Sequence, residues 1–143
     1  MKIRKANSFD VKEILRLLIN YGNETFIVEE EEESVAAMII NELKDGKLVI
    51  GLGASTKGNV LMQFVGITLK DIPYIGEVNT DKFGCYTPGT LIPIISEDEA
   101  RKMNPDYFFV FPWHFKEFIL EKEKVKLNKK TSLLFPLPTI ETF

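Results

Sequence analysis

A glycine-rich turn between an apolar strand and a helix constrains this chain more than any other sequence feature. Residues 47–51 are mostly apolar and strand-forming, Gly53 follows in the turn, and residues 56–65 have a helix-compatible, amphipathic pattern. Strand, glycine turn and helix form the first crossover of an open α/β sheet, where backbone N–H groups and a helix N-terminus can hold an anion. Lys57 adds a cation within reach of the same place. We therefore expect a site for a phosphate-bearing ligand at this turn.

The turn departs from both common phosphate-binding motifs. The sixth position of a dinucleotide fingerprint beginning at Gly51 is Thr56 instead of glycine, and the order Lys57-Gly58-Asn59 differs from that of a P-loop. Tight packing of strand against helix, without any ligand, is therefore a competing interpretation. Lys57 and Asn59 favour binding, because a lysine and an amide in a first helical turn pack poorly but bind phosphate or hydroxyl groups well. The ligand-binding residues predicted here are Gly51, Gly53, Ala54, Ser55, Lys57, Gly58 and Asn59.

Strands and helices alternate along the rest of the chain. The expected strands are residues 47–51, 74–79, 92–95, 107–111 and 132–135, and the expected helices are 56–65, 96–103 and 113–127. This alternation predicts an α/β fold with a small doubly wound, mostly parallel five-stranded sheet of Rossmann-like type. Apolar residues recur at helical spacing before residue 45. We therefore expect an N-terminal helical extension over residues 1–45 and a Rossmann-like domain over residues 46–143.

Two further segments reach the same edge of the predicted sheet. In a doubly wound sheet the carboxyl end of the second strand carries the acidic group that binds a ribose, and Asp81, followed by Lys82, lies at a suitable distance from the glycine turn. The loop over residues 79–90 is long enough to favour function, although its glycine and proline content also fits a plain surface loop. Trp113 and His114 directly follow the fourth strand. We add all four residues to the predicted ligand site, and we predict no catalytic residue and no metal ligand.

Charge and cysteine content narrow the classes of partner. The formal net charge is −3 without a basic stripe, which argues against a nucleic-acid partner. The single cysteine, Cys85, rules out an internal disulfide and a cysteine-based zinc site, and it fits a reducing compartment. No apolar run is long enough to cross a bilayer, and the N-terminus lacks a signal-peptide pattern. We therefore expect a cytoplasmic protein without a membrane partner.

Five segments in a fixed order carry a resemblance to a known family. They are residues 51–59, Asp81-Lys82-x-Gly84, residues 88–94, residues 104–107 and Pro112-Trp113. Together they resemble the C-terminal domain of sugar C-methyltransferases, S-adenosylmethionine-dependent enzymes that modify nucleotide-linked deoxysugars, and the similarity covers about residues 35–138. The resemblance implies a Rossmann-like domain that closes over the nucleotide-sugar. Leu52 and His114 depart from the family, in which Tyr and Asn are usual at these positions.

The resemblance also identifies parts that this sequence lacks. Enzymes of the family combine a zinc-binding N-terminal domain, a central S-adenosylmethionine domain with a Tyr-His-Glu-His catalytic stretch, and this C-terminal domain. The sequence contains neither a cysteine cluster nor that stretch, and it offers no evident base for removing a proton beside a keto group. We therefore expect that the chain binds no cofactor itself, that S-adenosylmethionine acts only through a partner domain, and that the chain alone does not methylate.

The expected function is that of a nucleotide-sugar-binding module, working with a methyltransferase subunit in trans or as a fragment of one. An orphan Rossmann-like module that senses a nucleotide or another phosphate-bearing ligand is the alternative. A third possibility is a small enzyme that uses His114 or Asp81. A face that docks a missing domain also leaves a homo-oligomer open.

Overall fold

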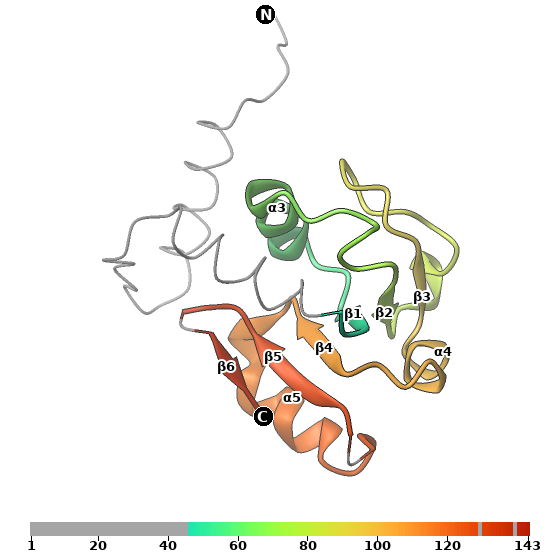
Figure 1. The fold of residues 1–143 in the computed structure, drawn as a ribbon. Helices are drawn as coiled ribbons and strands as arrows, with labels where there is room; N and C mark the ends of the chain where they lie inside the picture. The colour runs from blue at the N-terminus through green and yellow to red at the C-terminus, as the bar shows by residue number, and fades with distance from the viewer. Residues whose placement is uncertain (1–45, 129, 139) are drawn as a thin grey trace, which may run out of the picture.

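A six-stranded β-sheet forms the centre of the described part of the chain (Figure 1). The computed structural model describes residues 46–128, 130–138 and 140–143, so the helices expected in residues 1–45 lie outside the described residues. The strands are β1 (Val49–Leu52), β2 (Ile75–Glu77), β3 (Ile94–Ser96), β4 (Tyr107–Val110), β5 (Ser132–Phe135) and β6 (Glu141–Thr142). Their order is β3-β2-β1-β4-β5-β6, parallel throughout except for β6, which is antiparallel to β5. The predicted mostly parallel sheet is confirmed, and β6 is an additional edge strand.

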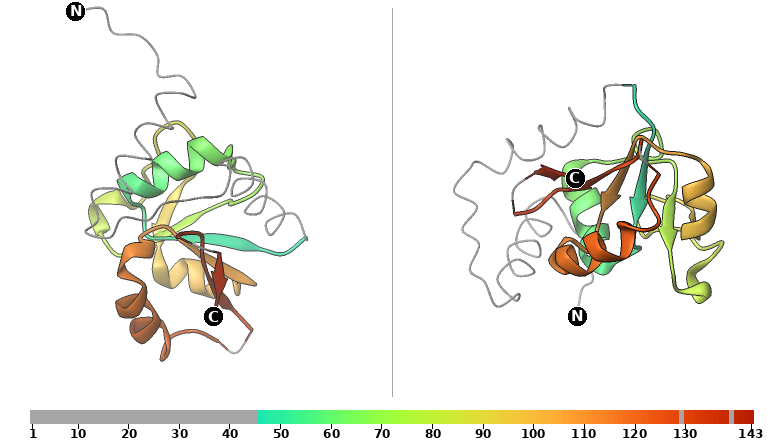
Figure 2. Two further views of the ribbon diagram at one scale, coloured as in Figure 1. Left: turned by 90° about the vertical axis from the view of Figure 1, so that its left-hand side faces the viewer. Right: turned by 90° about the horizontal axis from the view of Figure 1, so that it is seen from below.

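Helices cover both faces of the sheet. They are α3 (Thr56–Val65), α4 (Glu97–Lys102) and α5 (Lys116–Glu123), with single 3₁₀ turns η1 (Thr80–Lys82) and η2 (Trp113–Phe115). Helix α3 lies on one face, and α4 and α5 lie on the other (Figure 2, left). Consecutive strand residues point to opposite faces, so Phe109 packs with Leu61 of α3, whereas Phe108 belongs to the cluster that contains Ala100 and Ile119. Burial on both faces explains why the central strands are continuously apolar.

Local capping chemistry sets the ends of two helices. The Ser55 side chain accepts a hydrogen bond from the Gly58 N–H (2.9 Å) at the start of α3. A capping box joins Ser96 and Glu99 at the start of α4, as the sequence predicts. The third helix is shorter than expected, because residues 113–115 form η2 and α5 ends at Glu123.

The strand order reverses between β1 and β4. The chain leaves β1 through α3 toward β2 on one side, whereas it leaves β4 through α5 toward β5 on the other. Open α/β sheets bind ligands in the crevice outside the carboxyl ends of two such strands, because the connecting segments diverge there. Within the described residues, no helix is long and apolar enough to cross a membrane.

Candidate ligand-binding site

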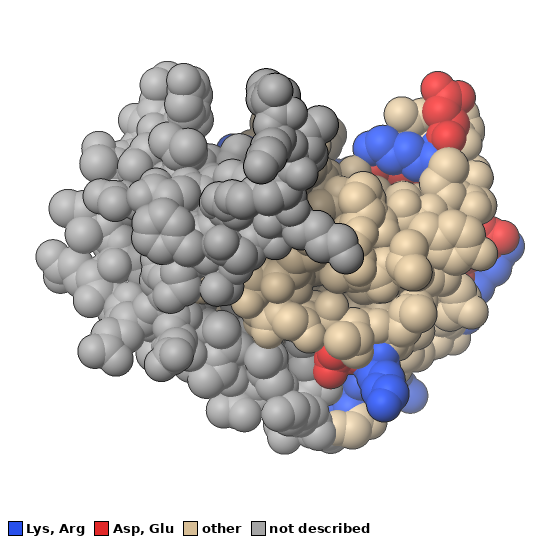
Figure 3. All heavy atoms as spheres, turned by 90° about the horizontal axis from the view of Figure 1, so that it is seen from above, with Lys and Arg blue, Asp and Glu red and all other residues tan. Residues whose placement is uncertain are grey.

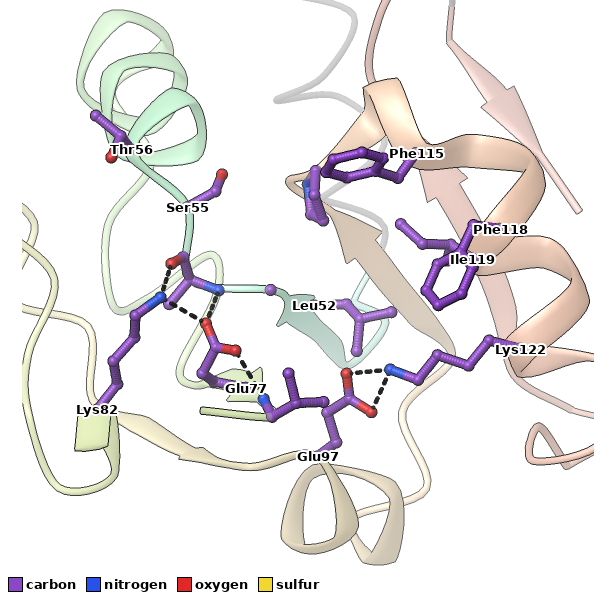
Figure 4. Close-up of a pocket in the computed structure, with 14 residues that line it drawn as sticks. Leu52, Ser55, Thr56, Glu77, Lys82, Glu97, Phe115, Phe118, Ile119 and Lys122 are labelled. Atoms are coloured by element: carbon purple, nitrogen blue, oxygen red, sulfur yellow. Dashed lines mark hydrogen bonds and ion pairs between the residues drawn. The ribbon is translucent and has the colours of Figure 1, made fainter. Parts of the chain in front are cut away.

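A pocket of about 420 Å³ opens beside the carboxyl ends of β1 and β2 (Figure 4). Residues 53–56, which form the turn into α3, line one side, and α5 lines the other. Glu77 and Lys82 lie near the turn, and Lys122 extends from α5 toward Glu97 of α4. The volume is within the range of pockets that hold small molecules. The pocket therefore lies where the topology predicts a ligand.

The turn between β1 and α3 requires glycine at position 53. Gly53 has a φ of 82°, and a Cβ atom there would lie 2.8 Å from Cδ of Pro112, which follows β4. The left-handed backbone and this close approach both exclude a side chain. The contact also shows that the segments after β1 and β4 meet at the same edge of the sheet.

The first turn of α3 carries no acidic residue of its own. Ser55 and Thr56, at the start of this helix, line the pocket. The first turn of α4, in contrast, contains three acidic residues. Unpaired backbone N–H groups and the helix dipole favour negative charge at such an end. The α3 side of the pocket is therefore its anion-compatible side.

Glu77 ties the turn after β1 to the end of β2. Its carboxylate accepts hydrogen bonds from the backbone N–H groups of Ala54 (3.0 Å), Val78 (2.7 Å) and Asn79 (3.0 Å). The Lys82 ammonium donates to Glu77 Oε2 (3.0 Å) and to the Ala54 carbonyl oxygen (2.9 Å). Burial alone raises the pKa of Glu77, but these backbone and lysine hydrogen bonds outweigh it and bring the pKa below its ordinary value. Glu77 is therefore ionised, and its hydrogen bonds stabilise the turn between β1 and α3.

A second ionic cluster joins α4 to α5. The Lys122 ammonium lies 2.7 and 2.8 Å from the two carboxylate oxygens of Glu97, and one Arg101 nitrogen lies 2.7 Å from both Glu97 and Glu123. Burial raises the pKa of Glu97, but the hydrogen bonds from Lys122 and Arg101 outweigh it and lower the pKa overall. Of this cluster, Glu97 and Lys122 line the pocket and pair with each other, so this part of the pocket is polar without a marked excess of charge.

Four of the predicted ligand residues line the pocket, namely Gly53, Ala54, Ser55 and Lys82. Gly51 and Gly58 have a packing role, because a Cβ atom at either position would come within 2.5 or 2.6 Å of the Phe111 ring or its Cβ. The ligand-free interpretation of a glycine-rich turn therefore accounts for these two glycines.

Asp81 lies in η1, exposed to solvent, and is not among the pocket-lining residues. The acidic residue at the carboxyl end of β2 is Glu77, which the sequence analysis missed. An acidic residue within an apolar strand was the signal that could have identified it. The loop that follows η1 does not line the pocket. It lies against α3, where the Gln63 amide of that helix donates to the Pro88 carbonyl oxygen of the loop (3.3 Å).

The remaining predicted residues lie near the start of α3 and after β4, outside the pocket lining. Burial lowers the pKa of His114, and the nearby charge of Lys57 lowers it further. Trp113 is partly buried and packs against both apolar clusters. Asn59 Oδ1 is shielded from solvent and accepts no hydrogen bond from the described residues. Lys57 and His114 therefore lie close to each other at the switch between β1 and β4.

Charged side chains are scattered on the face seen from above. In Figure 3, lysine, arginine and acidic side chains of the described residues form small separate groups among uncharged atoms. Among these residues, no three histidine, cysteine or acidic side chains are grouped so that they could hold a metal ion.

Comparison with known proteins gives two matches. The family model described as the C-methyltransferase C-terminal domain matches residues 13–138. The C-methyltransferase NovU of Streptomyces niveus is 31% identical over 104 residues, which cover 73% of this chain and 25% of NovU. The matched region therefore spans about a quarter of the length of that relative.

Proposed function

We propose, since the chain belongs to the C-methyltransferase C-terminal domain family, that it binds a nucleotide-sugar in the pocket beside the β1–α3 turn. In this proposal the chain is a substrate-binding module that works with a methyltransferase part carrying the methyl donor. The relative NovU is named as a C-methyltransferase, and the matched region is only a quarter of it.

One observation carries the proposal: the pocket is continuous with the start of α3. Ser55 and Thr56 of that start line the pocket, and Lys57 follows in the same turn. A diphosphate placed there would accept hydrogen bonds from backbone N–H groups at the helix start. Lys57 lies in the same helical turn, outside the lining, and Lys82 in the lining is paired with Glu77. The other end of the ligand would then extend toward α5.

The lowered pKa values of the two pocket carboxylates support a role in ligand binding and not in catalysis. A general base works best when its pKa lies near the operating pH. Glu77 and Glu97 have lowered pKa values and are held by several donors each. They are therefore poor bases for removing a proton from a sugar. This fits a module whose catalytic groups belong to another part.

The fluorescence of Trp113 offers a direct test, because it is the only tryptophan and lies in η2 beside the pocket. A titration with dTDP-hexose should give a saturable change in emission. The Lys57→Ala variant should bind about tenfold more weakly or worse, because a positive charge beside the phosphates is removed. Lys70→Ala, which changes an exposed lysine outside the pocket, is the matched control. Equal affinities for the two variants would contradict the placement of the phosphates at α3.

An orphan module that senses a nucleotide is the second candidate. Leu52, at which the family usually carries Tyr, is buried in β1 and lines the pocket, so a change of ligand is compatible with the same fold. Binding of free dTDP as tight as binding of dTDP-hexose would favour this candidate.

A further inference from the structure

Two exposed phenylalanines stand at the α5 side of the pocket. Phe115 and Phe118 are 58% and 70% exposed, yet both line the pocket together with the buried side chains of Leu52 and Ile119. Figure 4 shows them across the pocket from Ser55 and Thr56. A single exposed apolar residue needs no explanation, but two aromatic rings at the mouth of a pocket are available to contact a ligand.

The charge of this side is balanced. The charged groups on the α5 side of the pocket are Glu97 and Lys122, and the Lys122 ammonium contacts both carboxylate oxygens of Glu97. A phosphate placed here would meet a cation that is already neutralised. On the α3 side Glu77 is likewise paired with Lys82, but the backbone N–H groups and the dipole at the helix start add a partial positive charge. The α5 side is therefore better suited to an uncharged part of the ligand.

The α5 side of the pocket offers few hydrogen-bond partners, and this decides which uncharged part of the ligand fits there. The lining on this side otherwise contains the apolar side chains of Leu52, Pro112 and Ile119, and its charged residues are Glu97 and Lys122. A hexose would lose water from several hydroxyl groups and recover few hydrogen bonds there. A planar base would stack on a phenyl ring and present only its polar edge to the ion pair.

We infer that Phe118, with Phe115 beside it, forms the stacking face for the base of the bound nucleotide, and that the Glu97–Lys122 pair contacts the edge of that base. The inference rests on the proposed function, because it assigns one end of the same pocket. The base then lies against α5 and the diphosphate at the start of α3, so the sugar lies beyond the α3 end.

The test combines two ligands with three variants. Calorimetric titrations with dTDP-hexose and with hexose 1-phosphate are made on the unmodified chain and on Phe118→Ala, Phe118→Leu and Phe83→Ala. Phe83 is 38% exposed and lies outside the pocket, so Phe83→Ala is the matched control. Phe118→Leu keeps an apolar side chain of similar size but removes the aromatic ring.

We expect Phe118→Ala to weaken dTDP-hexose binding by about tenfold or more, as loss of a base-stacking side chain does. Phe118→Leu should also weaken it, Phe83→Ala should leave it unchanged, and hexose 1-phosphate should bind more weakly than dTDP-hexose to the unmodified chain. Saturation transfer from the protein should reach the base protons in the unmodified chain and should decrease in Phe118→Ala.

Different outcomes separate the inference from the proposed function. If dTDP-hexose binds the unmodified chain, the Phe118 variants and Phe83→Ala equally well, the inference is overturned and the proposed function stands. If hexose 1-phosphate binds as tightly as dTDP-hexose and loses as much affinity in Phe118→Ala, the rings hold the sugar and the inference is again wrong. If neither ligand binds the unmodified chain, the proposed function fails and the inference fails with it.

Discussion

The charge of Lys57 acts on His114 at the carboxyl edge of the sheet. Burial lowers the pKa of His114 below its ordinary value, and the positive charge of Lys57 lowers it further. His114 is therefore neutral at pH 7, and Lys57 carries the positive charge of this pair. Of these two side chains, we therefore expect Lys57 to contribute more to the binding of an anionic ligand.

A proton NMR titration checks this pair directly, because His114 is the only histidine and gives a single imidazole signal. We predict a pKa below 6.5, the ordinary value, in the unmodified chain. The Lys57→Ala variant should raise the pKa of His114, since it removes a nearby positive charge, and Lys70→Ala should leave it unchanged. A pKa of His114 that does not change in Lys57→Ala would contradict the proximity of the two side chains.

Local chemistry decides which single residues the sequence predicts well. Ser55 and Gly53 are recognisable because a helix cap and a tight turn involve only a few neighbouring residues. The sequence did not identify Glu77 as a site residue, because its carboxylate accepts a hydrogen bond from a distant segment. That segment is the turn between β1 and α3, which contains Ala54. The expectation for Asp81 rested on its distance along the sequence, and that distance did not specify where β2 ends.

At the level of elements, Phe111 determines how β1 and α3 pack. Its ring and Cβ fill the space in which the side chains of residues 51 and 58 would lie, so the strand and the helix each have a glycine where they approach Phe111. Gly58 lies inside α3, where glycine usually weakens a helix. The glycine at position 58 is therefore explained by its close packing against Phe111.

The Gly58→Ala variant tests this packing. Alanine would stabilise an isolated helix by about 1 kcal/mol. Here its Cβ would lie 2.6 Å from Cβ of Phe111, and such overpacking costs about 1–3 kcal/mol. We therefore predict a lower free energy of unfolding in urea for Gly58→Ala. Lys57→Ala in the same helix should change it by less than about 0.5 kcal/mol. A Gly58→Ala variant as stable as the unmodified chain would show that the packing can relax.

The periodicity of apolar residues predicts most elements, but not every boundary. The limits of α3 and β5 agree with the sequence expectation, because caps and apolar runs mark their ends clearly. Strand β6 contains only Glu141 and Thr142, which is too short to produce a pattern. It is specified by its pairing with β5, which is information that lies outside the segment itself.

At the scale of the whole molecule, two buried carboxylates connect segments that are distant in the sequence. Glu77 joins the turn after β1 to β2, and Glu97 joins α4 to α5. Their pKa values in the folded chain are below the ordinary value of 4.5. Since the folded state binds these protons less readily than the unfolded state, the stability they contribute is present above about pH 4.5 and is lost as the pH falls below it.

Urea unfolding at several pH values tests this linkage. The free energy of unfolding should decrease modestly below about pH 6.5, because the lowered pKa of His114 means that the unfolded state takes up this proton first. It should fall further below pH 4.5. Glu97→Gln should lower stability at pH 7 and reduce the further loss in acid, because one of the two groups no longer titrates. Asp98→Asn, at an exposed neighbouring position, should retain the acid dependence of the unmodified chain. A stability that stays constant down to pH 3.5 would contradict the role of these carboxylates.

The sheet order explains why the position of the candidate site could be predicted from the sequence, although several of its lining residues could not. Parallel strands direct their carboxyl ends to one edge, so the turns after β1 and β4 had to meet there, and Pro112 does contact Gly53. Which side chains then face the pocket depends on how α4 and α5 pack. That packing places Glu97, Phe118 and Lys122 in the lining, and none of them was singled out by the sequence.

The most direct test of the central claim, that this chain binds a nucleotide-sugar and leaves the methyl donor to another part, is a calorimetric titration. The chain is titrated with dTDP-hexose and UDP-hexose, and with S-adenosylmethionine in parallel. We predict saturable binding of a nucleotide-sugar and no binding of S-adenosylmethionine. Binding of S-adenosylmethionine, or no binding of either nucleotide-sugar, would contradict this account.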